Sequence, residues 1–462
     1  MKPDWRQYSG LFSDSRKVTE GSVFFCVPKS KAVSEKYINQ AIDNGAKLIV
    51  VEEGNEAFLS PAIVFSTTDI HQLMSEAASE FYSKKPSHIA AVTGTNGKTS
   101  TVAFVAQMIE LLGQKASTIG TLGIGFNGSY VELENTTPGA LDMADYLNKF
   151  ADNGIDYAVF EASSHALDQH RIDFIKPKAA GFTNLTQDHL DYHKDMASYL
   201  KAKKRLFFDL LDSEGVAVLN ADDESFWELS QCGRKVISYG WNGSDIRLSE
   251  VSLSGSGQKI KLELFGKIRE TLLPVSGDFQ VMNALCALGL MIGLGFNAEE
   301  SFSCLAKLSA PNGRMDFVAE HNGALIYVDY AHTPDALEKA IQSLRPYAKN
   351  KMKVLFGCGG DRDKTKRPIM GRIASKQADV VYVTDDNPRT ENAVLIRKEV
   401  LNGVSNNAID AGNRSAALAL AVKELEPGDV LLVAGKGHEN YQVIGTEKIH
   451  FDDKEEILKN LS

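Results

Sequence analysis

A glycine-rich segment that ends in lysine and threonine carries the clearest chemical signal in the sequence. It follows an apolar, β-branched run at residues 88–92, which predicts a buried strand, and it precedes a helical pattern at residues 99–112. A strand, loop and helix in this order turn backbone N–H groups and a helix N-terminus toward a phosphate. We expect Lys98 to reach the β- and γ-phosphates of a nucleotide and Thr99 to offer its hydroxyl to Mg²⁺. The residues expected to contact the nucleotide in this loop are Gly94, Thr95, Asn96, Gly97, Lys98, Thr99 and Ser100.

The loop departs from the common phosphate-loop spacing at one position. Val92 stands where the pattern G-x-x-x-x-G-K-[ST] has its first glycine, so this is a variant loop. A plain glycine turn between strand and helix is the alternative interpretation, but Gly-Lys-Thr between a strand and a helix favours phosphate binding.

A carboxylate lies at the end of a second predicted strand. Glu161 follows the apolar run at residues 157–160 and precedes Ala-Ser-Ser-His. Open α/β sheets bind ligands beyond the carboxyl ends of their strands, and an acidic side chain beside a phosphate loop suits Mg²⁺. A solvated turn that is capped by Ser163 or Ser164 is an equally good interpretation of this cluster.

A histidine and a group of lysines follow. His189 lies in Asp-His-Leu-Asp at residues 188–191, after another predicted strand, and is either a metal ligand or, more commonly, a hydrogen-bonded loop histidine. Lys201, Lys203 and Lys204 lie in a helical stretch, and their spacing alone favours a solvated basic face.

The elements that must position these residues divide into three predicted domains, at residues 1–86, 87–310 and 311–462. Strands that alternate with helices predict an α/β protein, with a central ATPase-like parallel sheet and a C-terminal Rossmann-like sheet. A Ser/Gly-rich stretch at residues 238–273 predicts an antiparallel edge. Strands are predicted at 22–27, 47–52, 88–92, 157–160, 179–182, 216–219, 325–330, 353–356, 380–384 and 430–433, and helices at 37–44, 70–82, 99–112 and 281–295.

Composition narrows the class of protein. Hydrophobic residues make up 43% of the 462 residues and the formal net charge is −10, which argues against a nucleic-acid-binding protein. Five scattered cysteines show no metal-site or disulfide spacing. No apolar run reaches the ~18 residues of a membrane span, and the first ten residues do not form a signal peptide. The cysteine pattern fits a reducing cytoplasm, so we expect a cytoplasmic protein. We also expect a monomer.

Several motifs in fixed order resemble the Mur ligase family over nearly the whole chain, and within it the branch that adds the third residue to a UDP-N-acetylmuramoyl peptide. The resemblance implies three domains that bind, in order, the uridine nucleotide, ATP and the incoming amino acid. It also implies a two-step reaction: ATP phosphorylates a substrate carboxylate, and an amine then displaces phosphate from the acyl phosphate. The motifs are residues 93–99, 161–165, 188–191, 329–335 and 359–363.

The resemblance assigns roles residue by residue. It implies ATP and Mg²⁺ as cofactors, with Thr99, Glu161 and His189 as metal ligands, and Lys203 as a carbamylated lysine that holds a second Mg²⁺. That implication reverses the solvated interpretation of Lys203. The resemblance also places Asn283 near adenine and Arg314 and His332 over the nucleotide. It assigns to UDP-N-acetylmuramoyl-L-alanyl-D-glutamate the residues Ser15, Thr136, Thr137, Ser163, Gln169 and Arg171. The chain departs from the family at Gln280, where Asn is common, and at residues 28–35.

The tetrapeptide Asp386-Asn387-Pro388-Arg389 bears on the choice of amino acid. By itself it reads equally well as a turn. Within the family it resembles the signature of enzymes that add meso-2,6-diaminopimelate, whose second carboxylate suits the planar fork of Arg389. The resemblance adds to this amino-acid site Arg362, Gly435 and Glu439.

Four other functions compete with this interpretation. The same ligase could add L-lysine, but Arg389 would then have no anion. A folylpolyglutamate synthase-like ligase is a second alternative, but the sequences Asp-Asn-Pro-Arg and Gly-Lys-Gly-His-Glu, the latter at residues 435–439, argue against it. A catalytically silent nucleotide-binding scaffold would not need the candidate metal residues, and a metabolic kinase would not need the third domain.

Overall fold

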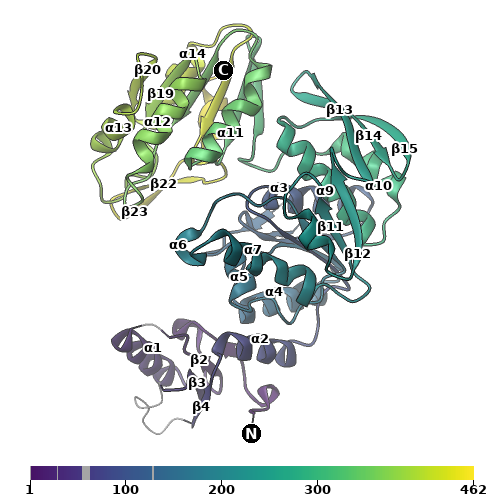
Figure 1. Cartoon of the computed structure of the whole chain (residues 1–462). Coiled ribbons are helices and arrows are strands. Elements are labelled where there is room, and N and C mark those ends of the chain that lie inside the picture. Colours follow the sequence, from purple (N-terminus) through teal and green to yellow (C-terminus); the bar gives the residue numbers. More distant parts are fainter. Residues whose placement is uncertain (1, 29, 55–62, 127–128, 462) are drawn as a thin grey trace. The chain divides into compact units, whose positions relative to one another are not determined.

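The computed structural model describes residues 2–28, 30–54, 63–126 and 129–461 (Figure 1). The chain forms two compact units, one of residues 1–244 with 286–301 and the other of residues 245–285 with 302–462. The α/β class is confirmed, whereas the division into three domains stays a prediction. No helix in the described part of the chain is long and apolar enough to cross a membrane. All five cysteines are free and buried.

A four-stranded parallel sheet opens the first unit, and its strands follow one another in sequence order. The two predicted strands and the predicted helix at 70–82 are confirmed, while the helix predicted at 37–44 begins earlier. Sequence patterns missed the last strand because only three apolar residues mark it. The elements are β1 (Leu11–Phe12), β2 (Val23–Phe25), α1 (Lys31–Asp43), β3 (Leu48–Glu52), β4 (Ile63–Thr67) and α2 (Ile70–Phe81).

The central sheet of the first unit has β5 (His88–Thr93) in its middle and runs in the order β12-β11-β10-β5-β9-β6-β7-β8. Its strands are parallel from β12 to β6, and β7 and β8 add to it in antiparallel fashion. The other strands are β6 (Ala116–Gly120), β7 (Gly123–Phe126), β8 (Ser129–Val131), β9 (Tyr157–Glu161), β10 (Ala179–Phe182), β11 (Val216–Asn220) and β12 (Lys235–Gly240).

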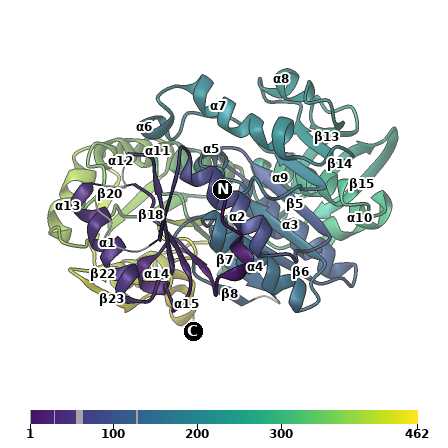
Figure 2. The ribbon, with the colours of Figure 1, turned by 90° about the horizontal axis from the view of Figure 1, so that it is seen from below.

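Helices cover both faces of this sheet (Figure 2). One face buries an apolar cluster with α4 (Ala140–Asp152), α5 (Ser164–Asp168) and the π-helical turn η4 (Leu206–Leu210). The opposite face receives α3 (Lys98–Leu111), which packs on β5, β6 and β9, and the later turns of α9 (Asp278–Gly293). The remaining helices of this unit are α6 (Leu190–His193), α7 (Met196–Arg205) and α8 (Phe226–Ser230).

The second unit contains three antiparallel strands and a six-stranded sheet. The strands β13 (Ile246–Ser254), β14 (Gly257–Leu264) and β15 (Lys267–Leu273) confirm the antiparallel expectation for this stretch. The larger sheet runs β16-β17-β21-β18-β19-β20, with only β16 antiparallel. Its strands are β16 (Asp316–His321), β17 (Ala324–Asp329), β18 (Met352–Phe356), β19 (Val380–Thr384), β20 (Ala408–Gly412) and β21 (Val430–Ala434).

Two helical layers cover the six-stranded sheet (Figure 1). Apolar side chains of α11 (Pro334–Leu344), α12 (Lys366–Gln377) and α13 (Ala393–Leu401) form one core cluster. Those of α14 (Arg414–Lys423) and α15 (Asp453–Lys459) form a second cluster. A hairpin of β22 (Tyr441–Ile444) and β23 (Glu447–His450) follows β21, and α10 (Ala298–Cys304) precedes this sheet in the chain. The polar loops of interest leave the carboxyl ends of β17, β18, β19 and β21.

Candidate functional site

The glycine loop between β5 and α3 is held by a neighbouring segment of the chain. Gly94 has a φ of 145°, and a Cβ there would lie 1.9 Å from the hydroxyl oxygen of Thr183, so no larger residue fits. The N–H of Thr95 donates to the backbone carbonyl of Asn184 at 2.8 Å, and the N–H of Asn96 donates to the Asn184 side-chain carbonyl at 3.0 Å. The loop is therefore a defined structure, braced from the end of β10.

The predicted nucleotide residues of this loop lie together. Gly97, with a φ of 89°, precedes Lys98, the first residue of α3. Thr99 and Ser100 are buried in the first turn of the helix. The ammonium of Lys98 donates to the backbone carbonyls of Gly94 and Thr95, at 2.9 and 2.8 Å. The side chain thus folds back over the loop that a phosphate would enter.

Lys203 reaches the same loop from α7 and is almost fully buried, with 1% of its surface exposed. Its Nζ donates to the carbonyl of Gly94 at 2.8 Å and lies 4.3 Å from the centre of the Tyr199 ring. Burial, and then the positive charge of Lys98, lower the pKa of Lys203 well below its ordinary value. The solvated basic face predicted from spacing alone is wrong at this position, because α7 turns Lys203 toward the sheet while Lys201 stays exposed.

Glu161 is the last residue of β9 and is buried at the carboxyl end of the sheet. One carboxylate oxygen accepts the N–H of Thr121 at 2.8 Å, and the other accepts the Thr121 hydroxyl at 3.2 Å. A Cβ on Gly120 would lie 2.4 Å from the carboxylate, so glycine is needed beside it. Sequence patterns did not identify Thr121, because only the sheet brings the end of β6 next to the end of β9.

Four of the six residues predicted for the carboxylate-bearing substrate form one hydrogen-bonded group. The hydroxyl of Thr137 donates to the backbone carbonyl of Glu161 at 2.6 Å, and lies 3.1 Å from the hydroxyl of Ser163, which caps α5. Arg171 donates to the carbonyl of Thr137 at 2.8 Å and to the side-chain oxygen of Gln169 at 2.7 Å. Burial lowers the pKa of Arg171.

The other two residues of that prediction differ in position. The hydroxyl of Thr136 lies 3.3 Å from that of Thr121, at the edge of the same group. Ser15 belongs to the four-stranded sheet region, where its hydroxyl donates to Gln40 at 2.7 Å and its carbonyl accepts from Asn44 at 2.9 Å. No hydrogen bond among the described residues joins Ser15 to the other five.

His189 lies in a left-handed turn, with a φ of 52°, and about half of its side chain is exposed. Its ring centre is 5.0 Å from that of His165 and 6.1 Å from that of Tyr199, the residue beneath Lys203. The ring centre of His165 also lies 4.1 Å from that of Tyr192, with the two rings tilted by 42°. No group of three or more His, Cys, Asp or Glu side chains within the described ranges is assembled as a metal cage. This aromatic group was not evident from sequence, because its members lie on α5, α6 and α7.

The predicted adenine-side residues are joined through Gln280 in the second unit. Asn283 donates to the side-chain oxygen of Gln280 at 3.0 Å, and the Gln280 amide donates to the backbone carbonyl of Arg314 at 2.9 Å. The guanidinium of Arg314 lies over the Tyr330 ring at 4.6 Å. His332 packs against the same ring at 4.6 Å and is itself exposed.

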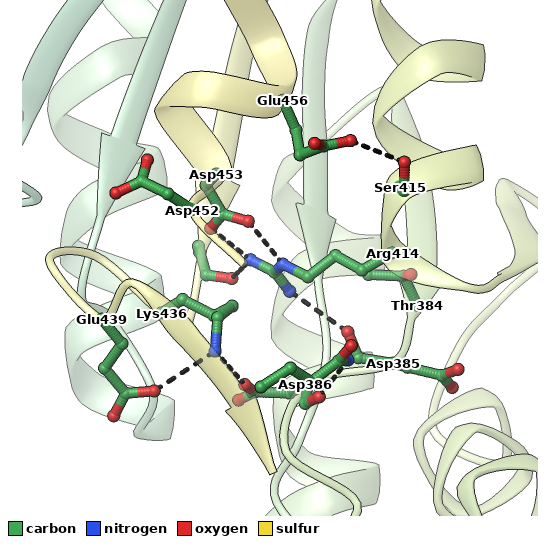
Figure 3. Close-up of polar contacts among 12 residues, drawn as sticks. Thr384, Asp385, Asp386, Arg414, Ser415, Lys436, Glu439, Asp452, Asp453 and Glu456 are labelled. Carbon is green, nitrogen blue, oxygen red and sulfur yellow. Dashed lines mark hydrogen bonds and ion pairs between the residues drawn. The ribbon is translucent and has the colours of Figure 1, made fainter. Parts of the chain in front are cut away.

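The loops after β19 and β21 meet around a buried cation, Lys436 (Figure 3). The Lys436 ammonium lies 3.4 Å from the side-chain oxygen of Asn387, 3.4 Å from the carboxylate of Glu439 and 3.8 Å from that of Asp386. The Asn387 amide also donates to Glu439, at 2.9 Å. Burial raises the pKa of Glu439 and Lys436 opposes that shift. Sequence patterns did not select Lys436, which has no exposed side-chain surface.

Arg389 is held by the hairpin that follows β21. It has a φ of 50°, its N–H donates to the carbonyl of Val443 at 3.0 Å, and its carbonyl accepts from Gly445 at 2.8 Å. One end of its guanidinium donates to the carbonyl of Gly360 at 2.8 Å. The tetrapeptide is therefore more than a turn, because it pairs with β22 and directs an arginine over the loop after β18.

The remaining predicted amino-acid residues lie around these loops. Arg362 is exposed and donates to the carbonyl of Asp361 at 3.3 Å. Pro388 is buried, and a Cβ on Gly360 would meet its carbonyl oxygen at 1.9 Å. Gly435 has a φ of 110° and donates its N–H to the carbonyl of Asp329 at 3.1 Å.

Two family models match the chain. Residues 92–291 match the Mur ligase middle domain, and residues 313–437 match the Mur ligase glutamate ligase domain. The chain is 44% identical to a UDP-N-acetylmuramoyl-L-alanyl-D-glutamate–2,6-diaminopimelate ligase of Bradyrhizobium diazoefficiens, over 99% of this chain and 95% of the relative. It is 41% identical to the corresponding ligase of Caulobacter vibrioides, over 98% of this chain and 95% of the relative.

Solved structures agree with these matches. A structure of a UDP-N-acetylmuramoyl-L-alanyl-D-glutamate–2,6-diaminopimelate ligase superposes with a TM-score of 0.72 at 32% identity, over 98% of this chain and 94% of that one. The fold is also shared with a MurF ligase from Thermotoga maritima in complex with ADP, with a TM-score of 0.66 at 19% identity, over 100% and 98%. A folylpolyglutamate synthase of Mycobacterium tuberculosis shares the fold with a TM-score of 0.63 at 18% identity, over 79% of this chain and 92% of that one.

Proposed function

The chain belongs to the Mur ligase family of ATP-dependent, amide-forming ligases, and from this membership we propose that it adds meso-2,6-diaminopimelate to UDP-N-acetylmuramoyl-L-alanyl-D-glutamate in peptidoglycan precursor synthesis. The substrate carboxylate attacks the γ-phosphorus of ATP, ADP leaves, and an acyl phosphate forms. The amine of diaminopimelate then attacks the acyl carbon, and phosphate leaves as the amide forms. A free carboxylate is a poor acyl donor, and phosphorylation supplies its leaving group.

The braced glycine loop supports ATP as the phosphate donor. Its backbone follows a strand into the N-terminus of α3, where N–H groups and the helix dipole favour an anion. The ammonium of Lys98 donates to the backbone carbonyls of Gly94 and Thr95, so it already lies at the loop that a phosphate would enter. Catalysis in such a site rests mainly on positioning and on charge stabilisation.

The residues near this loop fit Mg²⁺, which prefers oxygen ligands and commonly uses one or two carboxylates with substrate phosphates. Glu161 provides a buried carboxylate that is oriented by Thr121, and Thr99 provides a hydroxyl in the first turn of α3. We assign these two and His189 to the metal. Bound Mg²⁺ would neutralise charge on the phosphates during transfer.

Lys203 fits the role of a carbamylated lysine. The lowered pKa favours the neutral amine, which is the form whose nitrogen can attack carbon dioxide and lose a proton to give a carbamate. That change converts a buried cation next to Lys98 into an anion. An anion there would relieve the repulsion between the two lysines and would add oxygen ligands for a second Mg²⁺.

Thr137, Ser163, Gln169 and Arg171 are proposed to bind the peptide end of the uridylated substrate, because they form one polar group directly behind Glu161. Ser15 is assigned to the uridine end, which is the more distant part of a long substrate. Asn283, Arg314 and His332 are assigned to the nucleotide on the basis of the family.

The observation that carries the choice of amino acid is the position of Arg389. Its backbone is fixed by β22, one end of its guanidinium is anchored on Gly360, and we propose that the rest of the planar fork binds a carboxylate. Diaminopimelate has a second carboxylate where lysine has none. Glu439, Asn387, Asp386 and Gly435 offer acidic and polar atoms to the adjoining amino-acid group, and Arg362 and Pro388 border the same loops.

Turnover with alternative amino acids tests the proposal. Purified protein is mixed with ATP, Mg²⁺ and UDP-N-acetylmuramoyl-L-alanyl-D-glutamate, and phosphate release and product mass are followed with meso-diaminopimelate or with L-lysine. Turnover with diaminopimelate alone is the expected result. Turnover with lysine alone would retain the ligase and refute the role of Arg389, and no turnover with either, in folded protein, would refute the proposal.

A further inference from the structure

Arg414 and Asp453 form an ion pair with no exposed side-chain surface on either partner (Figure 3). Arg414 is the first residue of α14, and Asp453 is the first residue of the C-terminal helix α15. The guanidinium Nε and one terminal nitrogen donate to the two carboxylate oxygens, both at 2.7 Å. This paired geometry is the strongest form of arginine–carboxylate contact, and it fixes the plane of the guanidinium.

The guanidinium also donates to two backbone carbonyls, one of them from the terminal nitrogen that pairs with Asp453. One nitrogen donates to the carbonyl of Ala434 at 3.0 Å, and another to that of Asp385 at 3.4 Å. Ala434 is the last residue of β21, and Asp385 is the first residue after β19. These strands are not neighbours, because β18 lies between them in the sheet. Arg414 therefore spans three strands at their carboxyl ends.

The two carbonyls are the points at which the two amino-acid loops begin. Residues 386–389 follow Asp385, and residues 435–439 follow Ala434. The ammonium of Lys436 joins the same loops a second time through Asp386, Asn387 and Glu439. Two buried cations thus link the loops, in addition to the hydrogen bond from the Asn387 amide to Glu439, and Lys436 is itself carried by one of the loops. Only Arg414 is anchored outside them, on α15.

Resting on the function proposed above, we propose that Arg414, locked by Asp453, is a positioning residue for the incoming amino acid. It does not touch the substrate in this assignment. It sets the distance between Arg389 on one loop and Glu439 on the other, which must together match the two ends of diaminopimelate. Because small errors in the placement of binding groups cost large factors in rate, α15 becomes part of the specificity apparatus.

The variant Asp453→Asn tests this, because it keeps the side-chain volume and removes the charge that holds Arg414. Initial rates of phosphate release are measured with ATP and the UDP-linked substrate saturating and meso-diaminopimelate varied, and then with each of the others varied. The expected result is a rise of at least tenfold in the KM for diaminopimelate, with the KM for ATP and the KM for the UDP-linked substrate changed less than twofold. Arg414→Lys, which cannot reach all four acceptors, is expected to act in the same direction.

The Lys353–Asp429 pair provides a matched control in the same sheet. It is also buried, with 4% and 0% of the side-chain surfaces exposed, and its residues lie at the start of β18 and just before β21, at the opposite ends of the strands. Asp429→Asn is expected to lower thermal stability as much as Asp453→Asn while leaving the KM for diaminopimelate unchanged.

Three results would count against the inference. An unchanged KM for diaminopimelate in folded Asp453→Asn would overturn it, and so would an equal rise in Asp429→Asn, because the effect would then follow stability alone. Wild-type protein that does not turn over diaminopimelate would overturn the proposed function together with this inference. Wild-type turnover combined with an unchanged KM for diaminopimelate in Asp453→Asn would overturn this inference alone and leave the proposed function standing.

Discussion

Lys98 and Lys203 donate to one acceptor, the backbone carbonyl oxygen of Gly94, at 2.9 and 2.8 Å. Burial, and then the positive charge of Lys98 at the same oxygen, lower the pKa of Lys203. The repulsion falls if a phosphate draws Lys98 away or if Lys203 becomes an anion. If Lys98 binds a phosphate as proposed, we expect nucleotide binding and the protonation of Lys203 to be coupled through Gly94.

Replacing Lys203 by glutamine is expected to lower kcat by roughly 100-fold or more, because a polar side chain remains but no carbamate can form; removal of a single charge-stabilising group typically costs about this factor. Phosphate release under saturating substrates measures it. Lys201→Gln, two residues away on the exposed side of α7, is expected to keep activity within about twofold, as surface changes away from such features do. Equal losses in both variants would contradict the role of Lys203.

Replacing Gly94 by alanine is expected to abolish detectable nucleotide binding, because the new Cβ would lie 1.9 Å from the Thr183 hydroxyl. Calorimetric titration with ADP measures this. Gly113→Ala is a matched control for backbone strain, since Gly113 also has a positive φ, of 80°, but has nothing within 4 Å of the added Cβ. The control is expected to lose some stability and to retain ADP binding. Normal ADP affinity in folded Gly94→Ala would refute the importance of the close approach.

Glu161→Gln preserves the shape of the side chain and removes the charge proposed for Mg²⁺. We expect kcat to fall by roughly 100-fold and the Mg²⁺ concentration for half-maximal rate to rise, as is typical when an electrostatic contact to the reacting groups is removed. A magnesium titration of the rate measures both. Thr121→Val removes only the hydroxyl donor to the carboxylate, so its kcat and its half-maximal Mg²⁺ concentration should lie between those of Glu161→Gln and of the wild type. An unaltered magnesium dependence in Glu161→Gln would argue against its place at the metal.

Much of the architecture could be predicted because it depends on local patterns. Buried strands such as β5, β9 and β10 are continuous apolar runs, and Glu161 and Asp386 could be placed at strand ends from those runs alone. The burial of Lys203 could not be predicted from the sequence. Consecutive residues of a helix point 100° apart, and the lysines at 201, 203 and 204 do not follow a helical period that would assign one of them to the buried face.

Other parts of the candidate site depend on contacts between distant segments. Thr121 and Glu161 meet only because β6 pairs with β9, and Arg414 reaches Asp453 across 39 residues. No local pattern marks Lys436 in Gly-Lys-Gly, yet its side chain is buried and contacts both loops. The family resemblance supplied roles for residues whose burial and partners no local pattern could give.

Arg389→Ala is expected to raise the KM for diaminopimelate by roughly 10- to 100-fold, since a hydrogen bond to a charged group contributes about 1.5–3 kcal/mol. L-Lysine lacks the second carboxylate, so the rate with lysine should not fall in parallel, and the preference for diaminopimelate should shrink. Competition between the two amino acids, read by product mass, measures this. Arg372→Ala, at an exposed arginine of α12, is the control. A preference that survives in Arg389→Ala would assign carboxylate recognition elsewhere.

Glu391 predicts a pH dependence of stability. The pKa of Glu391 is lowered from 4.5 to about 2, first by the side chain of Arg367, then by the backbone N–H of Asp361 and by the side chain of Lys364. A depressed carboxyl pKa stabilises the folded state above the unfolded pKa, and this contribution is lost as the pH falls from about 4.5 through about 2. Glu391→Gln should therefore be less stable than wild type at pH 7, by a margin that narrows below pH 4.5. Urea unfolding at several pH values measures the margin, and Glu214→Gln, at an exposed glutamate, should show none.

The left-handed backbone of Arg389, with a φ of 50°, bears on how this protein could evolve. A residue with a Cβ in this region is less favourable than glycine by about 1–2 kcal/mol. A substitution by glycine or asparagine would relieve this backbone strain and make the fold more stable. If the guanidinium binds the substrate as proposed, selection for the reaction opposes selection for stability at this one position. In a lineage that no longer used diaminopimelate, Arg389 could be replaced by a less strained residue that stabilises the fold, while the surrounding hairpin stayed unchanged.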